Sequence, residues 1–497
     1  MRTGDREGGR VYIIGAGFAG RAIAREIKEK AVFGNVVAFL DDDPAKIGTR
    51  IDGITVLGPI RDVVNLLRRT PADEAVIAIP SATREALREL YFLLKRAGFS
   101  RIRIVPGIAQ IIEGDAHLIQ AREIESQDLL GRNPIAIGLR ESLSYLRGKR
   151  VLITGAGGSI GSELSRQLLS AGVSRLYLFG HGENSIYEID RELRLLREEG
   201  VGEKTSIVPL IGELKDAEYM RWVIGRLKAD AVFHAAAYKH VPMAEENPVA
   251  AIHNNVIGTR NLVEACLEAG VRRFVLVSTD KAVEPVSVYG ASKMLAERIA
   301  IAAAERAAPG RDFMVVRFGN VLGSRGSIVP LFSKQIEKGG PVTVTHPDVS
   351  RYFMTIPEAC SLVLKTGGVG KGGRTYLLDM GEPVRIRDLA EQMIRFHGFE
   401  PGRDIRIEYT GLRAGERLEE RLHSAEEVLV PTEYPRINRL ERREAAQEGL
   451  DALLAELAPH CVLSEGKEKL YRNRRSLRAV LKKYVPTLIV PEHEPEF

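Results

Sequence analysis

The sequence contains few cysteines, three in 497 residues, and Cys266, Cys360 and Cys461 lie far apart. Their number and spacing fit neither a disulfide framework nor a zinc motif. No carboxylate stands at metal-ligand spacing from His234 or His240, so we expect hydrogen-bonded structural histidines and no metal. A chain without disulfides fits a reducing compartment, and we therefore expect a cytoplasmic protein.

Long apolar runs and strong net charge are also missing. The N-terminal MRTGDREGGR has no apolar segment, which argues against a signal peptide. No run reaches the roughly 18 uncharged apolar residues of a membrane-spanning helix. The net charge of +5, without a basic block that alternates with aromatic residues, argues against a nucleic-acid partner. The hydrophobic share of 44% is that of an ordinary globular protein, and the length predicts two or three domains.

The chain begins with a first α/β unit. In RVYIIGAGFAGRAIAREI, a strand is followed by Gly15, Gly17 and Gly20 and then by a helix. The next strand, VVAFLDDDP, ends at Asp41–Asp43, at the offset where an acid can bind a ribose. We interpret residues 1–125 as a Rossmann-like domain. No catalytic cluster follows its strands, so either a ligand-binding module or a structural domain with a vestigial site is possible.

Residues 126–148 are predicted to be a linker, and residues 149–497 repeat the alternation of strands and helices. Six short apolar runs read as buried strands of a doubly wound parallel sheet: VLITGAG, RLYLFG, TSIVPLIG, AVFHAAA, RFVLVSTD and FMVVRFGN. Polar clusters follow four of them, and the carboxyl ends of parallel strands share one edge. We expect these clusters to meet there: Gly155–Gly161, Ala235–His240, Ser278–Lys281 and Arg317–Gly326.

The first cluster, in VLITGAGGSIGSEL, has Gly155, Gly158 and Gly161 between a strand and a helix. Such glycines let backbone amides approach a pyrophosphate at a helix N-terminus. Downstream, Tyr289 and Lys293 stand four residues apart, on one face of a helix, where a cation favours the phenolate. Together with Thr279, Asp280 and Lys281, they predict a site that oxidises an alcohol and eliminates a neighbouring group.

In the remaining residues the alternation of strands and helices is less regular. From residue 327 we expect a smaller C-terminal substrate lobe that closes over the cofactor cleft. From Glu441 we expect a charged, solvated pair of surface helices. The predicted fold is thus α/β, with two Rossmann-like doubly wound parallel-sheet domains, the second carrying the lobe.

The second domain resembles the extended short-chain dehydrogenase/reductases, and among them the nucleotide-sugar 4,6-dehydratases that act on UDP-N-acetylglucosamine in polysaccharide synthesis. The resemblance covers residues from about 126 to about 430. It is carried by TGAGGSIGSEL, HAAAYKHVPMAEENP, NNVIGTRNL, STDKAVEPVSVYGASK, RFGNVLGSRGSIVPLF, VSRYFMT and GLRAGERLEE. The first domain resembles the nucleotide-binding-like region of large membrane-anchored members. This chain has no transmembrane helices, so it is either naturally soluble or a truncated, membrane-associated form. A homo-oligomer is expected from the relatives.

The resemblance assigns roles to individual residues. The cofactor, NAD(P), is expected to contact Gly155, Gly158, Ser159, Ile160, Gly161, Ala235, Ala236, Tyr289 and Lys293. The catalytic residues are expected to be Thr279, Asp280, Lys281, Tyr289 and Lys293. The UDP-sugar substrate is expected to contact Lys239, Asn320, Arg325, Arg351 and Glu416.

Three positions depart from the family pattern. Many large members carry Met at the position of Tyr289, whereas a tyrosine is typical of the smaller members. The second strand of this domain ends at Gly180, where many relatives have an acid, but no Arg or Lys follows before Arg191, which favours NAD. Glu213 stands where relatives place Asp near the adenine.

The implied reaction begins when Tyr289, its pKa lowered by Lys293, removes the C4 hydroxyl proton and a hydride passes to the cofactor. Lys281 then removes the C5 proton, Asp280 protonates the departing C6 hydroxyl, and the hydride returns to C6. These roles require burial to lower the pKa of Lys281 and to raise that of Asp280. Two alternatives remain: a 4-epimerase, and a catalytically idle nucleotide-sensing protein.

Overall fold

The computed structural model describes residues 9–30, 34–79, 82–104, 122–123, 143–198, 200–442 and 449–494. The chain divides into two compact units, Met1–Gly138 and Leu139–Phe497. The predicted linker, residues 126–148, lies outside the described residues as far as residue 142.

The first unit is built on one mostly parallel sheet. Its described strands have the order β2-β1-β5-β6-β7, with only the β6–β7 pair antiparallel. The strands are β1 (Arg10–Ile14), β2 (Asn35–Leu40), β5 (Glu74–Ile77), β6 (Arg101–Ile104) and β7 (Arg122–Glu123). Helices α1 (Phe18–Lys30), α2 (Val63–Arg69) and α3 (Arg84–Ala97) accompany them, and a hairpin of β3 (Arg50–Ile51) and β4 (Ile54–Thr55) follows β2. The core forms where apolar residues of β1, β2 and β5 meet α1.

The second unit is built on a larger sheet. Its described strands have the order β10-β9-β8-β11-β12-β13-β18-β22-β21, parallel from β10 to β18. Strand order thus reverses beside β8, the switch point at which doubly wound sheets bind ligands. The parallel strands are β8 (Arg150–Thr154), β9 (Arg175–Gly180), β10 (Ser206–Ile211), β11 (Ala231–His234), β12 (Arg273–Thr279), β13 (Asp312–Phe318) and β18 (Thr375–Leu378). The antiparallel strands are β22 (Ile437–Arg442) and β21 (Glu427–Pro431).

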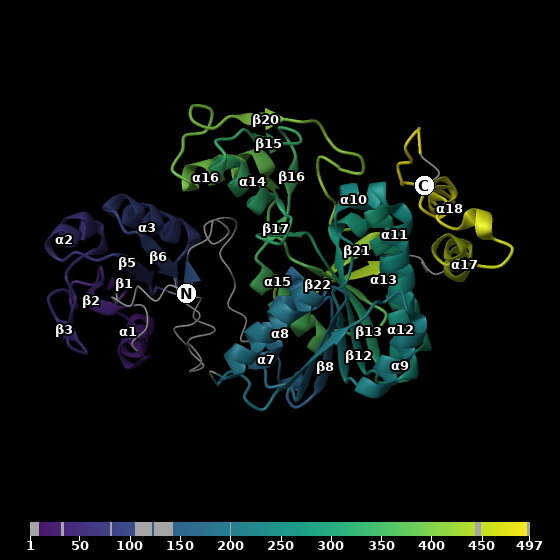
Figure 1. Cartoon of the computed structure of the whole chain (residues 1–497), viewed down its shortest axis with the longest axis horizontal. Helices are drawn as coiled ribbons and strands as arrows, with labels where there is room; N and C mark the ends of the chain where they lie inside the picture. The colour runs from purple at the N-terminus through teal and green to yellow at the C-terminus, as the bar shows by residue number, and fades with distance from the viewer. Residues whose placement is uncertain are drawn as a thin grey trace, which may run out of the picture. The chain divides into compact units, whose positions relative to one another are not determined.

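Helices cover this sheet on both faces, as Figure 1 shows. One layer contains α7 (Ser159–Ser170), α8 (Glu183–Glu198) and α15 (Ile356–Val369). The other contains α9 (Ala217–Leu227), α12 (Gly258–Glu268) and α13 (Val288–Arg306). This arrangement confirms the predicted doubly wound fold. The prediction that TSIVPLIG is a fully buried strand is wrong, because β10 is the outermost strand and Ile211 is 49% exposed.

A smaller lobe stands at the carboxyl edge of this sheet (Figure 1). It consists of β14 (Asn320–Val321), α14 (Ile328–Glu337), β15 (Val342–Val344), β16 (Ser350–Arg351), β17 (Phe353–Met354), β19 (Val384–Arg385), α16 (Ile386–Phe396) and β20 (Ile407–Tyr409). Residues 410–424, here named the return segment, connect β20 to β21. We call these elements the C-terminal lobe, and they match the expected smaller lobe.

The C-terminal tail is not a solvated helix pair, contrary to our prediction. One face of α17 (Leu450–Cys461) and α18 (Arg474–Tyr484) is apolar and lies in the same core as α12 and α13. Leu453 and Leu481 are fully buried there. The two helices of the tail are therefore amphipathic, and their apolar faces pack on the sheet domain. No helix in the described part of the chain is long and apolar enough to cross a membrane.

Candidate active site

The glycine turn after β8 forms a close-packed cradle. Gly155 has φ +71, a conformation that favours glycine, and a Cβ on it would lie 2.7 Å from Ala236 Cα. A Cβ on Gly161 would collide with Gly155 O. Helix α7 begins beside this turn, with Gly158 as its N-cap and no side chain that caps its first amides. The backbone amides of the first turn of α7 are therefore available to a phosphate.

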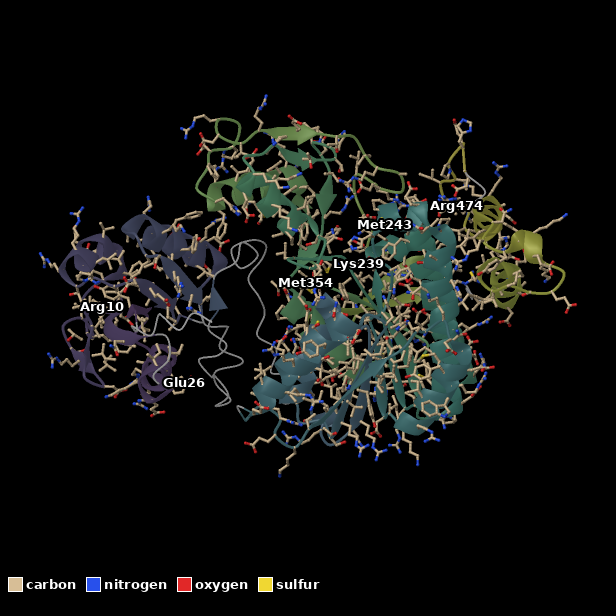
Figure 2. The ribbon with its side chains drawn as sticks, viewed as in Figure 1. Arg10, Glu26, Lys239, Met243, Met354 and Arg474 are labelled. Carbon is tan, nitrogen blue, oxygen red and sulfur yellow. The ribbon has the colours of Figure 1, made fainter. Side chains whose placement is uncertain are left out.

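Residues from the predicted substrate set lie beside this cradle. The Arg325 backbone amide donates to Ser159 Oγ at 3.1 Å, and Lys239 Nζ donates to Ser324 Oγ at 3.4 Å. Lys239 lies in the loop between β11 and the helix that begins at Val241 (Figure 2). Partial desolvation and the nearby Arg325 lower the pKa of Lys239. The glycine turn and these basic side chains thus meet at one edge of the sheet, as predicted.

The predicted acid and amine form a tight buried pair where β12 ends. Asp280 is fully buried, and its Oδ1 accepts from Lys281 Nζ at 3.0 Å and from Thr279 Oγ1 at 2.9 Å. Asp280 Oδ2 is buried without a hydrogen-bond partner. A buried carboxylate oxygen without a partner is costly, so this atom is available to a group of a substrate.

Tyr289 lies beside this pair but does not have the lowered pKa that we expected. Burial raises the pKa of Tyr289 to about 12, with a smaller contribution from Asp280, whereas Lys281 and a hydrogen bond with Thr279 lower it. Lys293 donates to the carbonyl oxygen of Val277 at 2.8 Å. Burial lowers the pKa of Lys293 to about 8, against the effect of Glu297. The neighbours that lower the pKa of Tyr289 are chiefly Lys281 and Thr279, not Lys293 as expected, and burial keeps the phenol protonated.

Lys281 also departs from the expectation of a lowered pKa. Burial alone would lower the pKa of this ammonium, but the charges of Asp280 and Glu420 outweigh burial and raise it. The reason is that two carboxylates face the ammonium: Asp280 Oδ1 at 3.0 Å and Glu420 Oε1 at 3.5 Å. Lys281 is thus held as an ammonium in the resting site.

The three other predicted substrate residues have different surroundings. Asn320 Oδ1 accepts from Lys281 Nζ at 3.1 Å and so belongs to the cluster around Asp280 and Lys281. The Arg351 guanidinium donates to the carbonyl oxygens of Arg417 and Leu418, at 2.8 and 2.9 Å, and so holds the return segment. Glu416 lies on that segment, and its Oε2 accepts from the backbone of Arg413 at 3.3 Å. The contacts of Glu416 are local, and none that is described joins it to Lys281.

Glu420 is the residue that sequence reasoning missed. Its side chain is only 6% exposed and approaches both Lys281 Nζ at 3.5 Å and Arg351 Nε at 4.0 Å. The segment GLRAGERLEE contains three glutamates, Glu416, Glu419 and Glu420, and the family resemblance pointed to Glu416. Only the path of the return segment shows which carboxylate turns inward.

Arg317 was grouped with the polar residues at the sheet edge, and this placement is wrong. It lies within β13, is 1% exposed, and pairs with Glu297 at 2.7 Å and Glu427 at 2.9 Å. His234 is structural, as predicted: its ring contacts the hydroxyls of Thr154 and Thr259 at 2.6 and 2.9 Å. Among the described residues, no cluster of His, Cys, Asp and Glu is arranged to hold a metal.

The glycine turn of the first unit has a different environment. Asp41, the candidate ribose ligand, accepts from the backbone of Ala16 at 2.7 Å and pairs with Lys46 at 3.2 Å. These bonds lower the pKa of Asp41 against the effect of its burial. The Asp41 carboxylate is therefore bound to the glycine turn and to Lys46.

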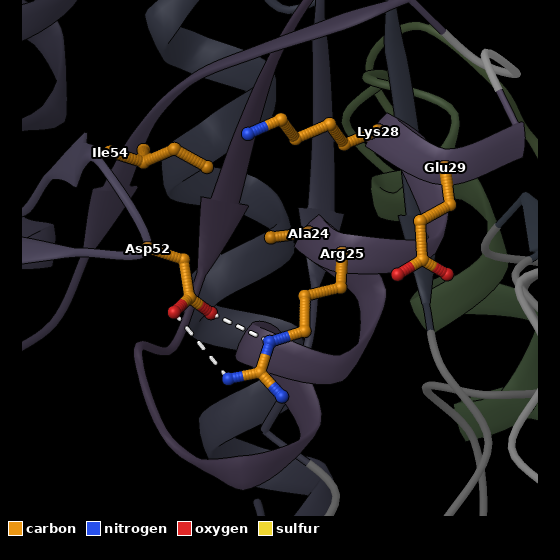
Figure 3. Close-up of a pocket in the computed structure, with 6 residues that line it drawn as sticks. All are labelled: Ala24, Arg25, Lys28, Glu29, Asp52 and Ile54. Atoms are coloured by element: carbon orange, nitrogen blue, oxygen red, sulfur yellow. Dashed lines mark hydrogen bonds and ion pairs between the residues drawn. The ribbon is translucent and has the colours of Figure 1, made fainter.

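A pocket of about 410 Å³ lies elsewhere in this unit, lined by Ala24, Arg25, Lys28, Glu29, Asp52 and Ile54 (Figure 3). The Arg25–Asp52 ion pair, at 2.8 Å, lies in its wall. The pocket adjoins the C-terminal half of α1, away from the glycine turn at the start of that helix, so it does not coincide with the predicted phosphate site.

Comparisons with known proteins agree with this arrangement. Residues 151–442 match the family described as polysaccharide biosynthesis protein, and residues 1–106 match the CoA-binding domain family. The probable polysaccharide biosynthesis protein EpsC of Bacillus subtilis is 42% identical over 86% of this chain and 71% of its own length. The capsular polysaccharide biosynthesis protein CapD of Staphylococcus aureus is 39% identical over 93% of this chain and 75% of its own.

A third relative carries a reaction in its name. The UDP-N-acetylglucosamine 4,6-dehydratase (inverting) of Campylobacter jejuni is 33% identical over 58% of this chain and 81% of its own. Among solved structures, Pen of Bacillus thuringiensis superposes with a TM-score of 0.54 at 31% identity, over 60% of this chain and 89% of its own.

Proposed function

Since the chain belongs to the family of polysaccharide biosynthesis proteins, we propose that it is an NAD(P)-dependent 4,6-dehydratase of UDP-N-acetylglucosamine. The product is a UDP-4-keto-6-deoxy-N-acetylhexosamine that serves polysaccharide or glycan synthesis. One observation carries the proposal: a buried carboxyl–ammonium pair, Asp280 and Lys281, 3.0 Å apart, lies beside the phenol of Tyr289 at the end of β12. An oxidation at C4 alone would need the phenol but not this pair.

The cradle around Gly155–Gly161 fits the pyrophosphate of a dinucleotide. Side chains are absent where the turn approaches Ala236, and the uncapped start of α7 offers amides to an anion. We take NAD over NADP, because the first Arg or Lys after β9 is Arg191, in the middle of α8. When bound, this cofactor would accept a hydride from C4 of the sugar and supply it to C6.

Tyr289 accepts the proton of the C4 hydroxyl. Burial keeps its phenol protonated, so this proton must pass to solvent before Tyr289 can act as a base. Thr279 and Lys281 are the neighbours that stabilise the phenolate. They stand on the same strand end, which places the C4 hydroxyl close to the groups that act at C5 and C6.

Asp280 and Lys281 share one proton, and this shared proton allows the pair to act both as the base at C5 and as the acid at the C6 hydroxyl. As an ion pair they are a carboxylate and an ammonium, and neither is then in its reactive form. Transfer of one proton across the 3.0 Å contact creates a neutral amine and a carboxylic acid together. Lys281 then removes the C5 proton, Asp280 protonates the departing C6 hydroxyl, and the original ion pair is restored as water leaves.

The reaction is tested by incubating the full chain with UDP-N-acetylglucosamine in deuterated water. We expect a 4-keto-6-deoxy product in mass spectra and deuterium at C5 in NMR spectra. Formation of UDP-N-acetylgalactosamine would instead identify a 4-epimerase. Binding of the UDP-sugar without turnover would identify a sensing protein, and either result would refute the proposal.

The role of Lys281 is tested separately by Lys281→Ala. This variant should retain oxidation at C4, seen as the absorbance of reduced nicotinamide, at a lower rate because Lys281 no longer stabilises the Tyr289 phenolate. It should lose the elimination of water. Lys334→Ala, an exposed lysine on α14, is the matched control and should be unchanged. Equal dehydration rates in Lys281→Ala and the wild type would overturn this assignment.

A further inference from the structure

The return segment crosses the active site and is fastened on both sides of it. On the lobe side, the Ser350 amide and the Arg351 guanidinium both bind the carbonyl oxygen of Leu418, at 3.0 and 2.9 Å. On the sheet-domain side, Arg417 donates to the carbonyl oxygens of Val283 and Glu284, directly after the catalytic 3-10 turn Asp280–Ala282. Two or three residues beyond these anchors, the segment places Glu420 within the catalytic cluster.

The Lys281 ammonium is surrounded by acceptors that match its three donors. Asp280 Oδ1 lies at 3.0 Å and Asn320 Oδ1 at 3.1 Å. Asp280 directly follows β12 of the sheet, whereas Asn320 begins β14 of the C-terminal lobe. Glu420 Oε1, at 3.5 Å, forms an ion pair with the same ammonium and comes from the return segment. Arg351 Nε lies 4.0 Å from the same carboxylate oxygen and balances part of its charge.

We propose that Glu420 is a positioning residue for the elimination step, whose carboxylate holds the Lys281 ammonium against Asp280 and Asn320. This inference rests on the proposed dehydratase function. The anchored return segment sets the place of the carboxylate, so the orientation and the charge of Lys281 depend on how the C-terminal lobe is seated. Glu420 contacts Lys281 rather than the reacting atoms and therefore acts through it.

The charged neighbours of Lys281 give a test with a definite sign. Asp280 and Glu420 raise the pKa of Lys281, against burial and Arg351, and Glu420 also raises the pKa of Tyr289. Glu420→Gln removes one negative charge and keeps the shape, so both pKa values should fall. A charge within about 4–6 Å commonly moves a pKa by about 1–3 units. The pH profile of dehydration should therefore move as a whole to lower pH, by about one unit or more.

The experiment compares the pH dependence of kcat in four proteins: the wild type, Glu420→Gln, Glu420→Asp and Glu419→Gln. Glu419 is the adjacent, exposed carboxylate and provides the matched control. We expect the downward shift in Glu420→Gln, a partial return in Glu420→Asp, and no shift in Glu419→Gln. If Glu420→Gln lowers the rate equally at every pH, the carboxylate only supports the lobe and the inference is wrong.

A second measurement separates this inference from the proposed function. Acetic anhydride labels neutral amines, and mass spectrometry of the Lys281 peptide then reports the titration of this lysine without any turnover. The labelling midpoint of Lys281 should fall in Glu420→Gln and stay in place in Glu419→Gln. An unchanged midpoint in Glu420→Gln would overturn the positioning role even if the chain is a dehydratase. A shifted midpoint without any 4-keto product would overturn the dehydratase function alone.

Discussion

Replacing Arg317 by methionine should destabilise the second unit by about 3–5 kcal/mol, the usual cost of breaking a buried ion pair from one side. Arg317 is 1% exposed and binds two carboxylates, Glu297 at 2.7 Å and Glu427 at 2.9 Å, whose side chains are 5% and 2% exposed. Methionine fills much of the same volume, so little cavity is created. The loss comes from removing the guanidinium that binds both buried carboxylates.

The predicted loss of stability comes from the burial of the ion pair and not from its hydrogen-bond geometry. A second arginine of the chain provides a control that separates the two effects. Arg306 binds both carboxylate oxygens of Glu264 at 2.6 Å, an equally good geometry, but its side chain is 59% exposed. Arg306→Met should therefore cost only about 0–1 kcal/mol. A triple variant, Arg317→Met with Glu297→Gln and Glu427→Gln, should regain stability because no uncompensated charge remains.

Urea unfolding followed by tryptophan fluorescence measures these differences. The chain has a single tryptophan, Trp222, on α9, so the signal reports the second unit. Linear extrapolation then yields the free energy of unfolding of each variant. If Arg317→Met costs no more than Arg306→Met, the argument that buried charge dominates this network is refuted.

Three further predictions concern the glycine turn, the tail and pH. Gly161→Ala should abolish cofactor binding in a titration, because its Cβ collides with the oxygen of Gly155, whereas Gly225→Ala, with open space around its Cβ, should bind normally. Arg478→Met should lower the thermal midpoint and the dehydration rate together. Buried Arg478 holds the Glu245 carboxylate, which accepts a hydrogen bond from the backbone amide of Val288, next to Tyr289. Loss of stability with full activity would contradict this link. Burial lowers the pKa of His234 from 6.5 to about 3, so the unfolded chain binds the extra proton and stability should fall as pH drops from about 6.5 towards 3. This slope should flatten in His234→Gln, and an equal slope in both proteins would show that another group causes it.

Much of the fold could be predicted because local patterns carry it. Apolar runs followed by glycine or polar residues predicted the strands β8, β9, β11, β12 and β13, and the shared carboxyl edge predicted that their polar ends would meet. The edge position of β10 was not predicted, because an apolar run predicts a strand but does not show whether that strand has one neighbour in the sheet or two. The docking of the tail was also missed, because the charged residues between and beside its helices drew attention away from the apolar residues of α17 that are buried.

The sequence predicted which residues lie together in the candidate site, but it did not predict the direction of their pKa shifts. The spacing of Asp280, Lys281 and Tyr289 placed all three together, because they follow one strand and begin the next helix. Their pKa values were predicted with the wrong sign for Lys281 and Tyr289. A pKa depends on the sum of burial and of charges from other segments, and such a sum has no local pattern in the chain.

The sequence alone therefore determined the family, the glycine cradle and the residues that can exchange protons, since each of these depends on neighbours within a few positions. Only the tertiary structure decided that Glu420, rather than Glu416, faces Lys281, at 3.5 Å. It also decided that Arg317 stabilises the core instead of binding a ligand. Both outcomes depend on where distant segments cross, and the balance between desolvation and charge at these crossings exists only after the chain has folded.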